Sequence, residues 1–332
     1  MILHPAILAL VAGSAVTALA TVGAAWFGLQ IIRKWDLSSG SELQLGLEKK
    51  TYLISTVMAY AFGFQIISLF LFIHTADSLC TMFTGAMCAA GTLAVNSFGY
   101  PVFVLKIVNF LFAGLWLIMN FTDNRAEDYP LIRKKYLLLL LIMPFVLAEA
   151  AVQAVYFFSL EADVITSCCG SLFSTEGKGV VQDALSLPVG PIRTLFFISA
   201  AFVMAAGTRL YLTGKGAYLF SAASLVMFVV SALSLMLFIS LYIYEIPTHH
   251  CPFCILKKEY HFIGYPLYGA LLTGAVGGIG TGMLQPFRKI RSLALIVPAI
   301  QKRLTLVAVI LYLIFSALSV YKMVFTTFML GG

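Results

Sequence analysis

Residues 217–246 read AYLFSAASLVMFVVSALSLMLFISLYIYEI, and no charged side chain interrupts them before Glu245. A bilayer core about 30 Å thick requires roughly 20 consecutive apolar residues per helix, so this stretch is long enough to cross a membrane. Seven other stretches share this character, at residues 5–32, 51–76, 101–122, 136–160, 192–213, 264–285 and 304–328. Only segments that bond their own backbone groups are stable in lipid. We therefore predict an all-α polytopic membrane protein with about eight transmembrane helices.

The composition supports the same fold class. The chain has 332 residues, of which 61% are hydrophobic and 11% charged, whereas soluble domains carry about 25% charged residues. The eight apolar stretches leave no room for a soluble domain of any size.

The basic residues predict the orientation. Most of the 21 Lys and Arg residues fall in alternate connections between the predicted spans, around residues 33–50, 125–135, 209–215 and 288–303. Because basic loops stay on the cytoplasmic side, both termini are expected in the periplasm. The short loops favour the cell inner membrane. The net charge of +7 reflects this orientation, and without a basic stripe interleaved with aromatic residues it does not indicate nucleic-acid binding.

A weak internal repeat suggests two four-helix halves, residues 1–160 and 161–332. Phe98-Gly99-Tyr100-Pro101 and Ile263-Gly264-Tyr265-Pro266 each follow a cysteine pair and open a predicted span. Proline is well suited to a first helical turn. Parallel halves related by an axis along the membrane normal would explain the repeat.

All six cysteines fall in three predicted outer loops, where disulfides can form and persist. Cys251-Pro252-Phe253-Cys254 has the spacing of a redox-active dithiol. His249, His250 and the lysines at 257 and 258 can supply the positive charge that stabilises a thiolate. A structural disulfide and half of a zinc site are the alternatives.

The two other pairs differ in spacing. Seven residues separate Cys80 from Cys88, which suits a mobile redox pair or a structural disulfide. Cys168 and Cys169 are adjacent, with Cα atoms about 3.8 Å apart, closer than the roughly 5.5–6 Å of a relaxed disulfide. This pair could be a strained reactive disulfide, could bond to other cysteines, or could bind a soft metal such as Cu(I) or Hg(II).

Within the spans, Glu149 is the clearest candidate for function, because a carboxylate in a membrane is costly. We expect it to contribute to cofactor binding, for example by supplying protons to a quinone, with an interfacial position as the alternative. His249 and His250 are further cofactor-binding candidates. Lys106 is expected to extend its ammonium to the interface.

The segment from Cys80 to Pro101 resembles the vitamin K epoxide reductase-like proteins, disulfide-generating quinone reductases. That family has a loop cysteine pair at this spacing, a similar helix start and a later Cys-x-x-Cys. The resemblance implies that Cys251 and Cys254 reduce a quinone while Cys80 and Cys88 relay electrons from a thioredoxin-like partner. This chain departs from the family in having eight predicted helices rather than four or five, and in its Cys168-Cys169 pair.

These observations predict a membrane thiol–disulfide oxidoreductase that passes electrons from a periplasmic thioredoxin-like protein or other dithiol to a quinone. The predicted catalytic residues are Cys80, Cys88, Cys168, Cys169, Cys251 and Cys254. Two alternatives remain open. One is a soft-metal-binding or transporting membrane protein, and the other is a membrane subunit of an electron-transfer complex with structural disulfides, which would associate with other membrane subunits.

Overall fold

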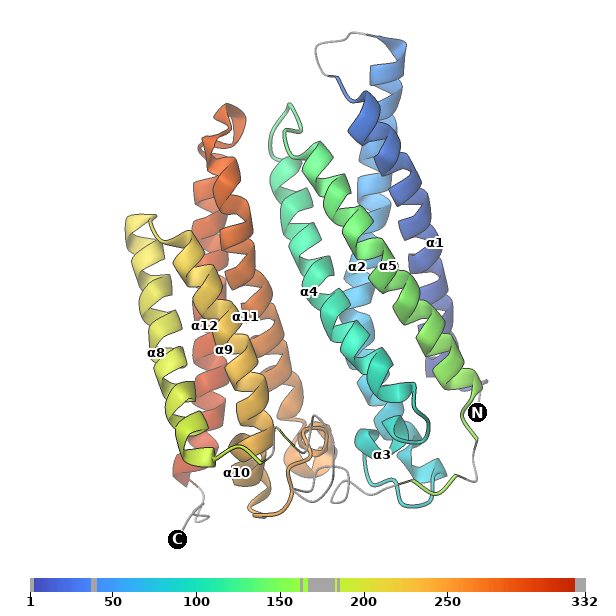
Figure 1. Ribbon diagram of the computed structural model, residues 1–332, viewed down its shortest axis with the longest axis vertical. Helices are drawn as coiled ribbons and strands as arrows, with labels where there is room; N and C mark the ends of the chain where they lie inside the picture. Colours follow the sequence, from blue (N-terminus) through green and yellow to red (C-terminus); the bar gives the residue numbers. More distant parts are fainter. Residues whose placement is uncertain (1–2, 37–40, 162–163, 167–182, 184–185, 326–332) are drawn as a thin grey trace. The chain divides into compact units, whose positions relative to one another are not determined.

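The computed structural model describes residues 3–36, 41–161, 164–166, 183 and 186–325, and Figure 1 shows its helices. Over these residues eight helices are long and apolar enough to cross a membrane. The β pairing found in the same part of the chain is one isolated bridge, between Thr84 and Ile165. The expected all-α, polytopic membrane fold is therefore confirmed.

The spanning helices account for most of the described chain. They are α1 (Pro5–Lys34), α2 (Glu42–Leu79), α4 (Gly99–Asp123), α5 (Ile132–Phe158), α8 (Val189–Thr213), α9 (Ala217–Ser234), α11 (Gly264–Leu284) and α12 (Ile296–Phe325). Helix α9 continues through a π-helical turn, η2 (Leu235–Ile239), into α10 (Ser240–Tyr244). The short connecting elements are η1 (Cys80–Met82), α3 (Ala89–Leu93), η3 (Cys254–Leu256), η4 (Lys258–Tyr260), η5 (Gln285–Lys289) and η6 (Arg291–Leu293).

The helix ends follow local chemistry. Helices α4 and α11 begin at Gly99 and Gly264, as the two Gly-Tyr-Pro tripeptides predict, with proline in each first turn. Helices α2 and α12 begin earlier than their apolar stretches, at Glu42 and Ile296. The added turns are rich in Glu, Gln, Lys and Arg, which are good helix formers. Apolar length therefore predicts the membrane-crossing part of a helix but not its full extent.

The chain separates into two compact units. The first comprises the described residues of Met1–Thr75, Asn96–Leu160 and Pro286–Ile300, and the second those of Ala76–Val95, Glu161–Gln285 and Gln301–Gly332. The segment with Cys80 and Cys88, which the sequence placed in a first half, thus packs within the second unit. The symmetry between two halves stays a prediction.

The first unit is built from α1, α2, α4 and α5, which run alongside one another in Figure 1. Its core includes Trp116, whose ring meets that of Phe62 edge-on at a centroid distance of 5.1 Å. The turn between α4 and α5 is closed by Asp123, which accepts a hydrogen bond from the backbone N–H of Leu131 and pairs with Lys135 at 2.8 Å. Lys135, in a connection that the sequence assigned to the cytoplasmic surface, is buried.

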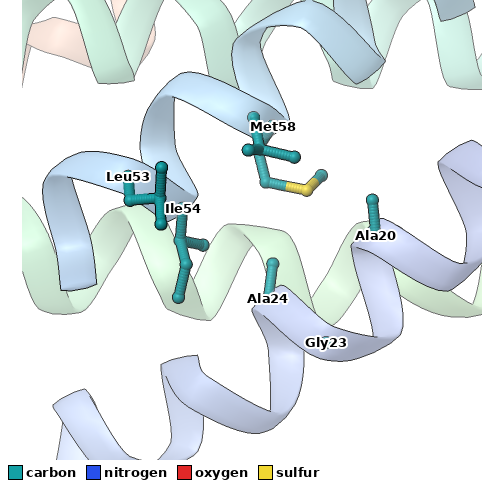
Figure 2. A pocket seen from close by; sticks show the side chains of 7 residues that line it. Ala20, Gly23, Ala24, Leu53, Ile54 and Met58 are labelled. Atoms are coloured by element: carbon teal, nitrogen blue, oxygen red, sulfur yellow. The ribbon is translucent and has the colours of Figure 1, made fainter.

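The same unit carries an apolar groove of about 220 Å³ between α1 and α2. Figure 2 shows its walls, and its lining residues are Ala20, Gly23, Ala24, Leu53, Ile54, Val57 and Met58. Its lining side chains are all apolar, so the groove offers no group for catalysis.

The second unit packs α11 closely against α9. A Cβ atom on Gly278 would collide with Ser224, and one on Gly282 would collide with Ser221. Glycine at these positions, four residues apart on one helix face, lets the two backbones approach, as small residues do between membrane helices. Gly274, on the same face, lies against the ring of Tyr312. The glycines spaced four residues apart on α11 therefore form a close helix contact.

Candidate functional site

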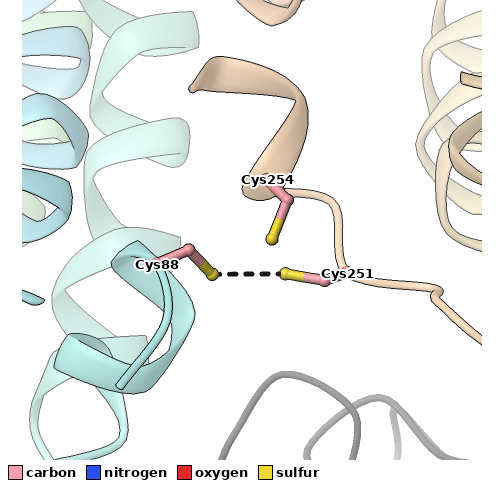
Figure 3. Close-up of side chains that lie close together, drawn as sticks. All are labelled: Cys88, Cys251 and Cys254. Atoms are coloured by element: carbon pink, nitrogen blue, oxygen red, sulfur yellow. Dashed lines mark hydrogen bonds between the residues drawn. The ribbon is translucent and has the colours of Figure 1, made fainter. Parts of the chain in front are cut away.

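Three cysteine thiols meet inside the second unit. Cys88 precedes α3, while Cys251 and Cys254 enclose Pro252-Phe253 at the start of η3. All three Sγ atoms lie within 4.8 Å of one another, and those of Cys88 and Cys251 are 3.6 Å apart. Figure 3 shows the side chains pointing toward a common centre. Thiols from two loops that are far apart in the sequence are therefore close enough for exchange.

The thiols differ in their access to solvent. Cys88 and Cys251 have relative exposures of 0%, whereas Cys80 and Cys254 each retain 7%. Cys80 begins η1, directly after α2, and is not one of the three clustered thiols. An external reagent can therefore reach Cys80 or Cys254 more readily than the Cys88–Cys251 contact.

Hydrogen bonds to backbone carbonyls hold the two loops around this cluster. The Tyr244 hydroxyl donates to the carbonyl of Cys251, and the Tyr268 hydroxyl donates to that of Pro252. The Lys257 ammonium donates to the carbonyl of Met87 at 2.7 Å, which joins the Cys-x-x-Cys loop to the residue before Cys88. These contacts fix the backbone of both loops around the three sulfur atoms.

Lys257 is a charged group beside the thiols, and His249 is a titratable one. Burial by itself would lower the pKa of Lys257, but the carboxylates of Asp77 and Glu259 and the thiols of Cys80 and Cys254 outweigh it, so this pKa is raised. Lys257 therefore stays an ammonium. Of the four residues that the sequence offered as sources of positive charge, Lys257 is the one that connects both thiol loops.

The two histidines of this loop have separate surroundings. Burial lowers the pKa of His249, although the Cys88 thiol acts in the opposite direction. The ring of His249 meets that of Tyr244 edge-on at a centroid distance of 4.7 Å. The Nδ1 atom of His250 is hydrogen-bonded to the carbonyl of Met236 at 3.0 Å. A role for either residue in binding a cofactor stays a prediction.

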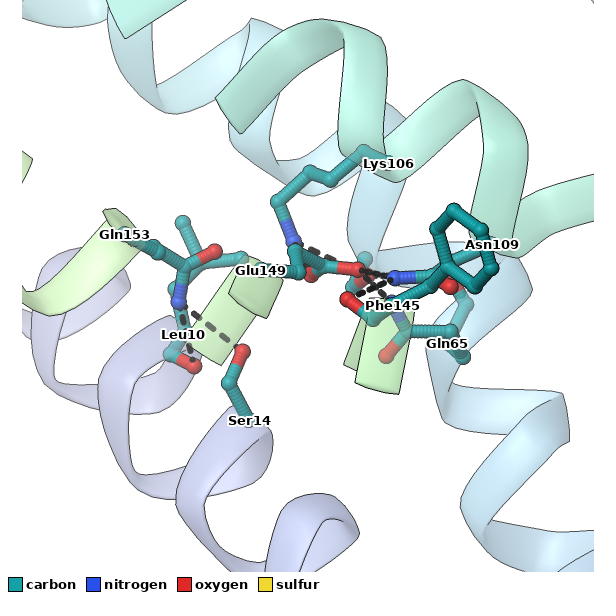
Figure 4. A network of polar contacts seen from close by, with 9 residues as sticks. Leu10, Ser14, Gln65, Lys106, Asn109, Phe145, Glu149 and Gln153 are labelled. Carbon is teal, nitrogen blue, oxygen red and sulfur yellow. Dashed lines mark hydrogen bonds and ion pairs between the residues drawn. The ribbon is translucent and has the colours of Figure 1, made fainter. Parts of the chain in front are cut away.

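Glu149 lies in the first unit, at the centre of a buried polar network (Figure 4). The ammonium of Lys106 pairs with it at 2.7 Å, the Asn109 amide donates to it at 2.6 Å, and the Gln65 amide also donates to it. Lys106 contacts Ser68 as well, at 3.2 Å. The expectation that Lys106 extends to the interface is wrong, because a carboxylate on α5 holds its ammonium inside the unit. Glu149 is likewise buried within the first unit.

A second polar contact follows on the next turn of α5. The Gln153 amide donates to the carbonyl of Leu10 and to the hydroxyl of Ser14, both on α1. Figure 4 shows Glu149 and Gln153 facing different helices. Polar residues on α5 therefore tie it to α1, α2 and α4.

The structure brings together some of the predicted catalytic residues. Cys88, Cys251 and Cys254 form the cluster, and Cys80 lies in the same unit. Cys168 and Cys169 lie outside the described residues. A contribution of that pair stays a prediction.

Sequence reasoning missed several supporting residues. Tyr244 and Tyr268 gave no signal, because a tyrosine near the end of an apolar span is common and its partner is set by the folded loop. Gln65 and Ser68 are polar residues within a predicted span, and the cost of burying polar groups in lipid could have identified them as network members.

Comparisons of the chain with protein-family models, with curated proteins and with solved structures find no match.

Proposed function

We propose that this membrane protein is a thiol–disulfide oxidoreductase that transfers electrons from an external dithiol to a membrane quinone. The observation that carries the proposal is the 3.6 Å contact between the Sγ atoms of Cys88 and Cys251. Thiol–disulfide exchange proceeds through attack of a thiolate on a disulfide sulfur, so the reacting atoms must be able to touch. This contact joins the two cysteine pairs that the sequence singled out.

The cycle begins when a quinone accepts two electrons and two protons from the Cys251/Cys254 dithiol, which becomes a disulfide while a quinol leaves. The Cys88 thiolate then attacks Cys251, whose Sγ atom is 3.6 Å away, to form a Cys88–Cys251 mixed disulfide and release Cys254 as a thiolate. Attack by Cys80 on Cys88 frees Cys251 and leaves a Cys80–Cys88 disulfide. An external dithiol reduces that disulfide by exchange. The net reaction converts one dithiol and one quinone into one disulfide and one quinol.

The burial pattern supports this order. Cys80 and Cys254 each keep 7% of their surface exposed, whereas Cys88 and Cys251 are sealed from solvent. Within the Cys80/Cys88 pair, Cys80 is therefore the more accessible thiol. The external dithiol is thus expected to exchange at Cys80, and the internal contact is protected from competing thiols. We assign the outer thiol to the periplasm, with both termini on that side of the inner membrane, because the basic connections belong to the cytoplasmic side. A periplasmic thioredoxin-like protein would be a suitable electron donor.

The electron acceptor that we propose is a membrane quinone. A quinone fits a protein whose described spans are apolar and whose thiols require a two-electron oxidant. Glu149, His249 and His250 remain our candidates for contacts with it or for proton delivery.

Trapping the mixed disulfide tests the central step. In a Cys168→Ser/Cys169→Ser background, the added changes Cys80→Ser and Cys254→Ser leave Cys88 and Cys251 as the only thiols. Mild oxidation of the purified protein is expected to join them, and mass spectrometry of digested peptides identifies the bond. The matched control changes Cys88 and Cys254 instead, which leaves Cys80 with Cys251.

Turnover tests the function itself. The purified protein should oxidise dithiothreitol with a short-chain ubiquinone analogue as acceptor, and Cys88→Ser should abolish that activity. If Cys88→Ser oxidises the dithiol at the wild-type rate, the relay is refuted. Equal crosslinking in the trapping experiment and its control would also contradict it.

A further inference from the structure

The three clustered thiols have the arrangement of a metal site as well as that of a redox pair with its partner. A disulfide uses two sulfur atoms, but here Cys88, Cys251 and Cys254 place three within 4.8 Å of one another. Metal–sulfur bonds of about 2.3 Å place neighbouring sulfur ligands roughly 3.8 Å apart in a tetrahedral site and about 4.0 Å apart in a trigonal plane. The separation of 3.6 Å between the Sγ atoms of Cys88 and Cys251 is close to both values.

The kind and number of donors select the ion. Thiolates are soft ligands that favour Cu(I), zinc and iron–sulfur clusters over hard cations. Structural zinc is almost always bound by four ligands, whereas the cluster in the described part of the chain offers three sulfur atoms and no histidine or carboxylate. Cu(I) is stable with three sulfur ligands. All three residues are buried, which disfavours water as a fourth ligand.

We propose that the reduced Cys88, Cys251 and Cys254 thiols form a three-coordinate site for Cu(I). Binding one Cu(I) with loss of three protons gives a site with a net charge of −2. The ammonium of Lys257 offsets part of that charge, since it interacts electrostatically with Cys254 and is anchored on the carbonyl of Met87. No change of oxidation state is involved.

Cu(I) binding at this site does not depend on the electron acceptor of the proposed function, and it requires a different set of cysteines. Metal binding requires Cys254 as a ligand and does not require Cys80, whereas the relay requires Cys80 to pass electrons to the outside. A bound ion would also block exchange, because a coordinated thiolate cannot attack a disulfide. Cu(I) and disulfide transfer would therefore exclude each other at the same sulfur atoms.

Titration with Cu(I) under anaerobic, reducing conditions tests the inference. The full-length protein in detergent, in the Cys168→Ser/Cys169→Ser background, competes with a chromophoric Cu(I) chelator. We expect one Cu(I) per chain. Cys88→Ser, Cys251→Ser and Cys254→Ser should each lower the Cu(I) affinity by more than the roughly 10–100-fold that loss of an outer-shell partner costs.

Cys80→Ser is the matched control, because Cys80 is also buried in the same unit but is not one of the three clustered thiols. Its affinity should stay near that of the background protein, while its dithiol oxidation should be lost if the relay operates. Alkylation supplies a second measurement without removing a ligand. Cu(I) should protect the three ligand thiols, and Cys80 should stay reactive.

Two results would overturn the copper site. One is an unchanged Cu(I) affinity in Cys251→Ser. The other is a loss of Cu(I) affinity in Cys80→Ser as large as the loss in Cys88→Ser. Tight Cu(I) binding without dithiol oxidation would refute the relay and leave the metal site standing. Dithiol oxidation without Cu(I) binding would refute the metal site and leave the relay standing.

Discussion

Lys106→Met should destabilise the first unit by several kcal/mol, because it removes one partner of a buried ion pair. The ammonium and the Glu149 carboxylate are 2.7 Å apart, and their side chains have exposures of 0% and 1%. With an effective dielectric constant of about 20, their gross Coulomb attraction is about 6 kcal/mol. Desolvation of both charges offsets much of this attraction.

The cost of breaking the pair is larger than its net contribution to stability, because the remaining charge stays buried. Removing one partner of such a pair typically costs about 3–5 kcal/mol. After Lys106→Met, Gln65 and Asn109 still donate to the carboxylate, so we expect a loss near the lower end, about 3 kcal/mol. Glu149→Gln should cost a similar amount, since it leaves the ammonium without its counter-ion.

The double variant, Lys106→Met with Glu149→Gln, gives the decisive comparison. It contains no buried charge at this position, and the new amide oxygen can still accept hydrogen bonds. The loss of stability in the double variant should be smaller than the sum of the losses in the two single variants by at least about 2 kcal/mol. This difference is within the range of coupling energies between contacting residues. Lys134→Met is the control, because Lys134 is an exposed lysine on the same helix as Glu149, and its effect should stay within about 0.5 kcal/mol.

Unfolding in mixed detergent micelles with increasing SDS can measure these differences through tryptophan fluorescence. All three tryptophans of the chain, Trp26, Trp35 and Trp116, belong to the first unit, so the signal reports on the unit that contains the pair. Additive losses in the double variant would refute the ion-pair reasoning. A loss below about 1 kcal/mol in Lys106→Met would do so as well, because it would mean that Glu149 needs no counter-ion.

Two further predictions concern the second unit. Lys257→Gln should shift the pH dependence of Cys80 alkylation toward higher pH, because an ammonium that interacts with this thiol favours its thiolate form. Lys257→Arg should keep the wild-type pH profile, and so should the control Lys258→Gln. An unshifted profile in Lys257→Gln would contradict the role of the Lys257 charge. Gly278→Val should lower the thermal stability of the protein in detergent, since a Cβ atom at position 278 meets Ser224. Gly269→Val is the control and should be tolerated, because nothing lies within 4 Å of a Cβ atom at position 269. Equal effects of the two changes on thermal stability would contradict the close packing of α9 and α11.

Much of the fold follows from local features of the sequence. The lipid requires apolar length and internal backbone bonding, so a segment such as 217–246 predicts its span without reference to the rest of the chain. Prolines 101 and 266 mark the first turns of α4 and α11 because the geometry of proline acts within one turn. The start of α2 at Glu42 was not predicted, because helix propensity, and not hydropathy, carries the helix beyond its apolar part.

The candidate site depends on contacts that no local pattern contains. The spacing of Cys80 and Cys88 and the Cys-x-x-Cys pattern indicate candidates for redox chemistry, yet each pattern suggests only a pairing within its own loop. Glu149 was identified from the cost of its charge in a membrane, but its pairing with Lys106 depends on how α4 and α5 pack. Sequence therefore predicts the chemical groups more reliably than their partners.

The contact between Cys88 and Cys251 spans 163 positions of the chain, and this separation determines what the site can do. Two structural disulfides, each within its own loop, would require no approach between the loops. Here the bond from Lys257 to Met87 holds the loops together beside the thiols, and the third sulfur, from Cys254, completes the cluster. Exchange between pairs and coordination of one ion both require this meeting of loops, whereas structural disulfides do not. The packing thus favours reactive thiols over structural ones.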